Sequence, residues 1–132
     1  FNQCYLTKLN GFCYIPYVQL RYNMKSLTNT DYQHVQNIKM SLIEKYGDLI
    51  FQIYCYGSRV LEQKQDTDFD LMIITSEKID WRTEDKITEI IYYYGLKHDI
   101  LFDVRYFSLN EIENKYKHMP FITEVKSYGI AI

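Results

Sequence analysis

The chain has 132 residues, with 15 basic and 17 acidic side chains and a net charge of −2. A chain of this length has room for one domain and little else, so we expect a single domain and not a multidomain enzyme. Its near-neutral charge gives no broad attraction for phosphate backbones or anionic membranes, so we expect no membrane partner and no stable binding of long nucleic acid. No run of residues approaches the roughly 18 apolar positions that a membrane helix needs.

Three cysteines, Cys4, Cys13 and Cys55, bear on the redox setting of the protein. Their odd number and irregular spacing fit neither a disulfide framework nor a zinc site. The pattern favours free thiols, and we therefore expect a reducing, cytoplasmic location.

The first residues of the chain, 1–23, differ from the rest. They begin without a methionine and show no sustained helical or strand periodicity. We therefore expect a lead-in segment over residues 1–23, non-native or translated from upstream sequence, and one domain over residues 24–132 that starts at Met24.

A helix is predicted after this segment. The run from Thr30 to Gln33 has the form of a capping box, with a hydroxyl at the N-cap and a glutamine three residues later. Val35, Ile38 and Leu42 then repeat at helical spacing, and Gly47 stands where a left-handed C-terminal cap is wanted.

Two strands are predicted next, over residues 49–56 and 68–75. Both runs are rich in β-branched and aromatic residues, and the first is short enough for a strand buried on both faces. The polar stretch between them is too short for a crossover helix, so we expect the strands to pair antiparallel.

The rest of the chain alternates between helix and strand patterns. Apolar residues follow helical spacing over 83–97, and strand chemistry returns over 99–107. A second capping-box form begins at Ser108, and Pro120 opens a last helix that ends at Gly129. The pattern predicts a small α/β fold with a mixed sheet and flanking helices.

Paired carboxylates mark the second strand. Asp68 and Asp70 are two residues apart, so in a strand both side chains point to the same face. Two like charges at the end of an apolar strand are best tolerated with a cation between them, and oxygen-only ligands suit Mg²⁺. The simpler alternative is that the two acids mark only the passage from turn to strand.

Two further features extend this pattern. Gly57-Ser58 ends the preceding strand, where a glycine lets the backbone approach a ligand and a hydroxyl can hold a phosphate. Asp103 lies in an otherwise apolar strand, and if that strand neighbours the second, it completes a triad with Asp68 and Asp70. The alternative for Asp103 is a buried ion pair with Arg105.

These residues resemble the DNA polymerase β-like nucleotidyltransferase superfamily, and within it the minimal nucleotidyltransferases. The resemblance consists of an apolar strand, Gly57-Ser58-Arg59, a spacer, Asp68-Phe69-Asp70, and a third acid at Asp103 on a later strand. The spacer is about one residue shorter than is common in the family, and Val60-Leu61-Glu62 replaces the small residues often found there. The resemblance covers the chain from about Met24 onward.

The resemblance implies that Asp68, Asp70 and Asp103 bind two Mg²⁺ ions that also hold the phosphates of ATP or another nucleoside triphosphate. Gly57 and Ser58 would cradle the triphosphate, with Arg59 as a further residue that neutralises its charge.

The activity implied is nucleotidyl transfer to an acceptor hydroxyl, with a tyrosine of a HEPN-type toxin partner as the acceptor and an antitoxin role for this chain. Two alternatives stay open. One is an antitoxin-like binding module without catalysis, and the other is nucleotidyl transfer to a small molecule.

Overall fold

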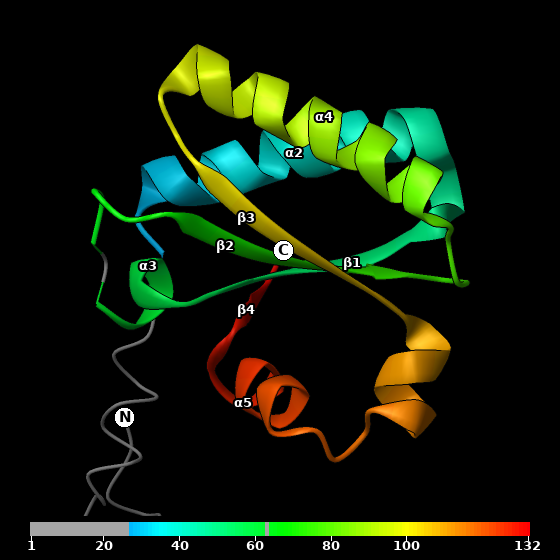
Figure 1. Cartoon of the computed structure of the whole chain (residues 1–132). Coiled ribbons are helices and arrows are strands. Elements are labelled where there is room, and N and C mark those ends of the chain that lie inside the picture. Colours follow the sequence, from blue (N-terminus) through cyan, green and yellow to red (C-terminus); the bar gives the residue numbers. More distant parts are fainter. Residues whose placement is uncertain (1–26, 63) are drawn as a thin grey trace, which may run out of the picture.

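Four strands form one mixed sheet in the computed structural model, which describes residues 27–62 and 64–132 (Figure 1). The strand order is β3-β2-β1-β4. β1 pairs antiparallel with β2 and with β4, whereas β2 and β3 are parallel. The strands are β1 (Ile50–Tyr56), β2 (Phe69–Thr75), β3 (Phe102–Ser108) and β4 (Ile130–Ala131). The expected lead-in over residues 1–23 and the start at Met24 lie outside the described residues.

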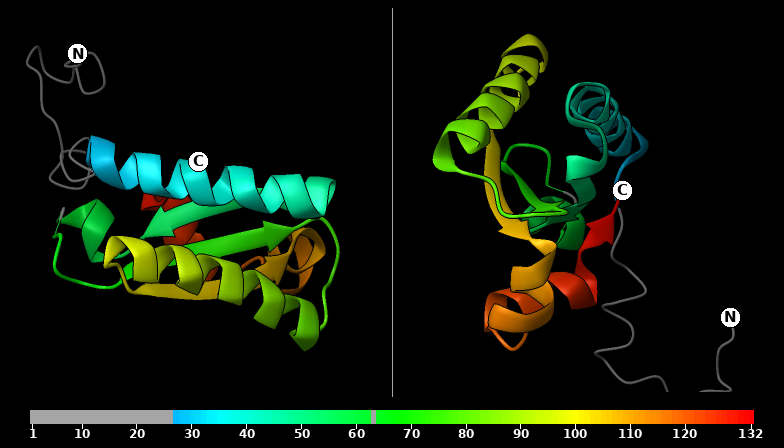
Figure 2. Two further views of the ribbon diagram at one scale, coloured as in Figure 1. Left: turned by 90° about the horizontal axis from the view of Figure 1, so that it is seen from above. Right: turned by 90° about the vertical axis from the view of Figure 1, so that its right-hand side faces the viewer.

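Helices cover both faces of this sheet, as Figure 2 shows. α2 (Asn29–Tyr46) and α4 (Trp81–His98) lie side by side on one face, and α5 (Pro120–Tyr128) lies on the other with the π-helical turn η3 (Glu111–Lys115). The parallel pair β2 and β3 needs a long crossover, which α4 provides. None of the helices in the described part of the chain has the length and apolar character to cross a membrane.

Two short elements complete the order. The 3-10 turn η2 (Gly47–Leu49) joins α2 to β1, and the one-turn helix α3 (Ser58–Leu61) follows β1. Gly47 caps the end of α2, as its position in the sequence predicts, but with a φ of 59° and a ψ of −131° its backbone is not in the expected left-handed helical conformation. The antiparallel pairing of the first two strands is also confirmed.

The predicted start of the first helix is wrong by two residues. Thr28, not Thr30, is the N-cap, and its hydroxyl accepts a hydrogen bond from the backbone N–H of Asp31 at 3.1 Å. Thr28 has the extended backbone that an N-cap requires, whereas Thr30 is already in the helix. Asp31 is therefore free to turn its carboxylate into the protein interior, where only 1% of the residue is exposed.

The second capping box is confirmed. The backbone N–H of Ser108 donates to the Glu111 carboxylate at 2.9 Å, and the N–H of Glu111 donates to the Ser108 hydroxyl at 3.2 Å. The helix that follows is the π turn η3 and not an α-helix. The two-residue strand β4 was not predicted, because two residues carry no periodicity.

Strand β2 forms the centre of the core. All its residues are buried except Asp70, which is half-buried. The expectation that β1 is buried on both faces is only partly met, since Phe51 is 52% exposed. Asp70 is therefore the one position at which the central strand opens toward solvent.

A buried ion pair joins α2 to the segment around α3. The guanidinium of Arg59 donates to the Asp31 carboxylate at 2.9 Å, and 5% of Arg59 and 1% of Asp31 are exposed. The same guanidinium donates to the backbone carbonyls of Gln65 and Thr67 and lies 4.8 Å from the ring centre of Phe69. One side chain thus ties the turn after β1 and the loop before β2 to the first helix.

This ion pair gives a stability prediction. Arg59→Met leaves the Asp31 carboxylate buried without its cation, and we expect a loss of about 3–5 kcal/mol of unfolding free energy. Adding Asp31→Leu to Arg59→Met removes the stranded charge, so the double variant should recover part of the loss. Urea denaturation of the three proteins measures this, and a double variant no more stable than Arg59→Met would contradict it.

Candidate active site

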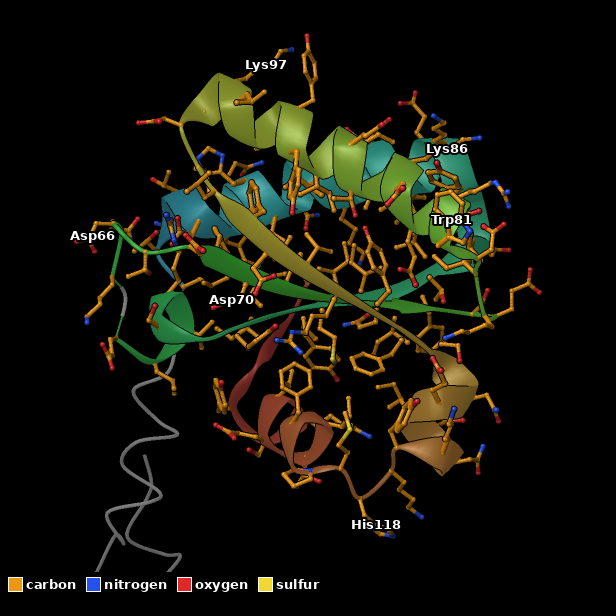
Figure 3. All side chains as sticks on the ribbon, viewed as in Figure 1. Asp66, Asp70, Trp81, Lys86, Lys97 and His118 are labelled. Atoms are coloured by element: carbon orange, nitrogen blue, oxygen red, sulfur yellow. The ribbon has the colours of Figure 1, made fainter. Side chains whose placement is uncertain are left out.

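The acidic residues meet at the parallel pair of strands. Asp70 on β2 stands directly opposite Asp103 on β3, so the two side chains emerge on the same face of the sheet. Their carboxyls lie within hydrogen-bonding reach of each other. This face is the one that α5 covers, and Figure 3 shows Asp70 near the end of the sheet where β2 begins, far from Trp81 at the start of α4.

Electrostatics at Asp70 are unfavourable for its ionised form. Its pKa is raised to about 6, first by desolvation and then by the negative charges of Asp103 and Asp68, while the positive charge of Arg105 lowers it. A bound cation would stabilise the ionised form of such a carboxyl, because it offsets the repulsion from the two acidic neighbours that favours the protonated form.

Asp103 is exposed, since β3 is an edge strand of the sheet formed by the described residues. The burial that the alternative interpretation of Asp103 requires is therefore absent. The alternative ion pair with Arg105 is not formed either, because none of the ion pairs in the described part of the chain includes Arg105.

Asp68 lies one residue before β2, and it is exposed. It stands at the rim of a pocket of about 390 Å³ between the end of α4 and the start of β2 and β3. The other lining residues are apolar or aromatic: Tyr92, Leu96, Ile100, Leu101 and Phe102. Asp68 thus connects the acidic pair to an apolar pocket.

Gly57 brings the main chain against Asp70. Its φ is +81° and its ψ is −161°, a conformation that is essentially restricted to glycine. A Cβ built on Gly57 would overlap the Oδ2 atom of Asp70, so no other residue fits without moving that carboxylate. The backbone N–H of Gly57 donates to the hydroxyl of Tyr128 on α5 at 3.4 Å.

Ser58 follows at the first position of α3, half-buried. Its hydroxyl lies 2.8 Å from the hydroxyl of Thr67, with which it shares a hydrogen bond. The turn that holds Gly57 and Ser58 is therefore fastened to the loop before β2, which carries Asp68.

Arg59 is the one candidate that the structure sets apart from the others. Its guanidinium is held by Asp31 and two backbone carbonyls on the α2 side of the sheet. The sequence pattern does not reveal this, because Asp31 lies 28 residues away and belongs in the sequence to a capping box. We therefore assign Arg59 to the fold and not to phosphate binding.

A second cation and its aromatic neighbours complete the site. Arg105 lies two residues after Asp103 and is exposed, with its Cζ atom 5.0 Å from the ring centre of Phe121 on α5. Arg105 also lies close enough to Tyr56, which stands opposite Asp70 on β1, to oppose the rise in the Tyr56 pKa that burial causes. The spacing of two residues from Asp103 puts Arg105 on this face, whereas nothing local in the sequence relates Tyr56 and Phe121 to the acids.

The donor set fits a divalent cation of the Mg²⁺ type. It consists of carboxylate oxygens, and the repulsion at Asp70 is of the kind that a cation relieves. Among the residues that the structure describes, no three His, Cys, Asp or Glu side chains form a ready-made metal cage. Mg²⁺ does not require one, because it keeps several waters and binds through one or two carboxylates and substrate phosphates.

No family model matches the chain, and no curated protein matches it. A functional interpretation therefore depends on the residues of the site.

Gly57 gives the first prediction for this site. Gly57→Ala combines backbone strain with a clash against Asp70, and we expect it to lower the unfolding free energy by more than the roughly 1–3 kcal/mol of strain alone. Gly47→Ala is a matched control, because Gly47 also has a positive φ but a Cβ there meets no atom within 4 Å. In a protein that already carries Asp70→Ala, Gly57→Ala should lose only the unfolding free energy due to backbone strain, because the carboxylate that the new Cβ would meet is gone. Equal costs in both backgrounds, measured by urea denaturation, would sink the prediction.

Asp70 gives a pH prediction for the protein without divalent cations. Because its folded pKa of about 6 lies above the unfolded value of 3.8, its contribution to stability is fully present below about pH 4 and is lost as the pH rises through 6. Asp70→Asn removes this contribution, so its stability relative to the parent should increase from pH 4 to pH 7. The control is Asp80→Asn, because Asp80, the N-cap of α4, has a lowered pKa: its contribution to stability is lost only as the pH falls below about 4, so Asp80→Asn should show little change relative to the parent between pH 5 and pH 7. Thermal melts in EDTA at several pH values test both.

Proposed function

We propose that this chain is a Mg²⁺-dependent nucleotidyltransferase of the polymerase β-like fold, which moves a nucleoside monophosphate, AMP from ATP, to an acceptor hydroxyl. The observation that carries the proposal is the position of Asp70, directly opposite Asp103 and against the Gly57 turn. Parallel pairing of β2 and β3 brings together the acids that the sequence separates by 33 residues.

Asp68, Asp70 and Asp103 are the residues that would hold two Mg²⁺ ions. When bound, the ions compensate the charge of the triphosphate and of the attacking and leaving oxygens. Gly57 and Ser58 let the main chain approach the phosphates, since Gly57 has no side chain to block them. The protein mainly supplies position and charge.

In the proposed reaction an acceptor oxygen attacks the α-phosphorus of ATP. A new phosphorus–oxygen bond forms, the bond to the pyrophosphate oxygen breaks, and the hydroxyl proton is lost. Asp103 is suited to orient the acceptor and receive that proton, because it is exposed on the edge strand whereas Asp70 is half-buried.

The acceptor we propose is a tyrosine of a HEPN-type protein, with this chain acting as its antitoxin in the cytoplasm. Support comes from the apolar pocket beside Asp68, because it suits an apolar protein side chain better than a polar sugar. Leu96 and Leu101 at this pocket are 81% and 73% exposed. Transfer to a small molecule is less well supported by such a lining.

A binding module without catalysis is the second candidate. The same exposed apolar side chains favour it, since a surface of this kind also suits a protein partner that is masked by contact alone. In that case the acids would be dispensable for neutralising the partner.

Radiolabelled ATP separates these functions. With Mg²⁺ and a HEPN-type partner, label from the α-phosphate should be transferred to the partner and label from the γ-phosphate should leave as pyrophosphate. Asp68→Asn with Asp70→Asn should abolish transfer, and the cost should exceed about 100-fold because the charge compensation is lost. EDTA should abolish it too.

The control is Asp66→Asn, a neighbouring exposed acid in the same loop, which should retain activity. A double variant that still neutralises the partner, together with a parent protein that never releases pyrophosphate, would exclude the enzyme and leave the binding module.

A further inference from the structure

We infer that Arg105 binds the polyphosphate chain of the nucleoside triphosphate in the candidate active site. The inference rests on the proposed function and adds to it a residue that discriminates triphosphates from monophosphates. It requires that Arg105 lie on the same face as the acids, that its charge be available, and that its side chain be held in place.

The strand register meets the first requirement. Arg105 follows Asp103 by two residues on β3, so both side chains lie on one face of the sheet. The Cα atom of Arg105 pairs with Met72, two residues beyond the pair of Asp70 and Asp103. The guanidinium is close enough to Asp70 to lower the pKa of that carboxyl.

Two aromatic side chains meet the third requirement. The guanidinium lies over the ring of Phe121, with 5.0 Å between Cζ and the ring centre. It also lies close enough to Tyr56, on β1 two strands away from β3, to oppose the rise in the Tyr56 pKa that burial causes. The side chain of Arg105 therefore lies toward β2 and the acidic pair. The rings of Tyr56 and Phe121 pack edge to face, with 5.3 Å between their centres, so the two aromatic side chains beside Arg105 hold each other in place.

The charge of Arg105 is available. It is exposed, and in the part of the chain that the structure describes it belongs to no ion pair. Arg59, the cation that the sequence offered for this purpose, is buried against Asp31. A triphosphate beside three carboxylates needs a compensating cation from the protein, and a guanidinium binds two phosphate oxygens at once.

A structural role is the competing explanation, since Arg105 also packs on Phe121. The two explanations differ in their dependence on the ligand. A packing role affects stability and all ligands alike, whereas a phosphate contact affects ligands according to their number of phosphates.

The test measures binding and not turnover. Isothermal titration with α,β-methylene-ATP, which cannot release pyrophosphate, and with AMP is performed in Mg²⁺ on the parent protein and on Arg105→Met. We expect the dissociation constant for the triphosphate analogue to rise about 10- to 100-fold and that for AMP to change less than about threefold. Arg105→Lys should recover part of the lost affinity, because lysine restores the positive charge but cannot bind two phosphate oxygens at once as a guanidinium does.

Arg82→Met is a matched control. Arg82 is also exposed and lies 4.7 Å from an aromatic ring, that of its neighbour Trp81 at the start of α4, and Figure 3 shows Trp81 far from Asp70. The Arg82→Met variant should bind both ligands with the dissociation constants of the parent protein. Tyr56→Phe removes only the hydroxyl near Arg105 and should raise the dissociation constant of the triphosphate analogue about two- to fivefold. This variant keeps the test valid if Arg105→Met does not fold.

The possible outcomes are distinct. A parent protein that binds neither ligand refutes the proposed function and the inference with it. Normal binding by the parent with unchanged affinity in Arg105→Met overturns the inference alone and leaves the proposed function standing. Equal weakening of AMP and of the triphosphate analogue also overturns it, because it indicates packing and not polyphosphate recognition.

Discussion

The buried ion pair between Arg59 and Asp31 is the constraint on which the candidate site depends. An arginine that is 5% exposed requires a partner and satisfied donors, and here the donors are used on one carboxylate and two backbone carbonyls. Those carbonyls belong to the loop that leads into Asp68, and Arg59 itself follows the Gly57 turn. Both loops of the site are thus anchored to α2 by a single guanidinium.

The sheet then assembles the chemistry from distant segments. Because β2 and β3 are parallel and neighbouring, the acid on each strand meets the other side by side, and α4 is the connection that makes this possible. Gly57 is required for a simple steric reason, since its missing Cβ is the space that the Asp70 carboxylate occupies. Asp70 is therefore the point of the fold at which a second acid and the main chain of Gly57 both come close.

Local sequence signals account for much of the fold. The capping box at Ser108, the cap at Gly47 and the antiparallel pairing of the first two strands follow from spacing and turn chemistry. The register of Asp103 against Asp70 was only conditional in the sequence, because strand order is a long-range property. The roles of Arg59 and the strand β4 depend on contacts between remote segments, which no local pattern encodes. Thr28 and Thr30 are both local candidates for the N-cap, and the sequence does not decide between them.

The place of β3 at the edge of the sheet has a further consequence, for association between molecules. An edge strand offers unpaired backbone groups that invite another strand to add to the sheet, and exposed charges oppose such addition. Asp103 and Arg105 are exposed on this strand, which is an edge among the described residues, so a second strand added there would have to remove water from both charged side chains. The residues assigned here to a ligand would then also protect the protein from aggregation through its own sheet.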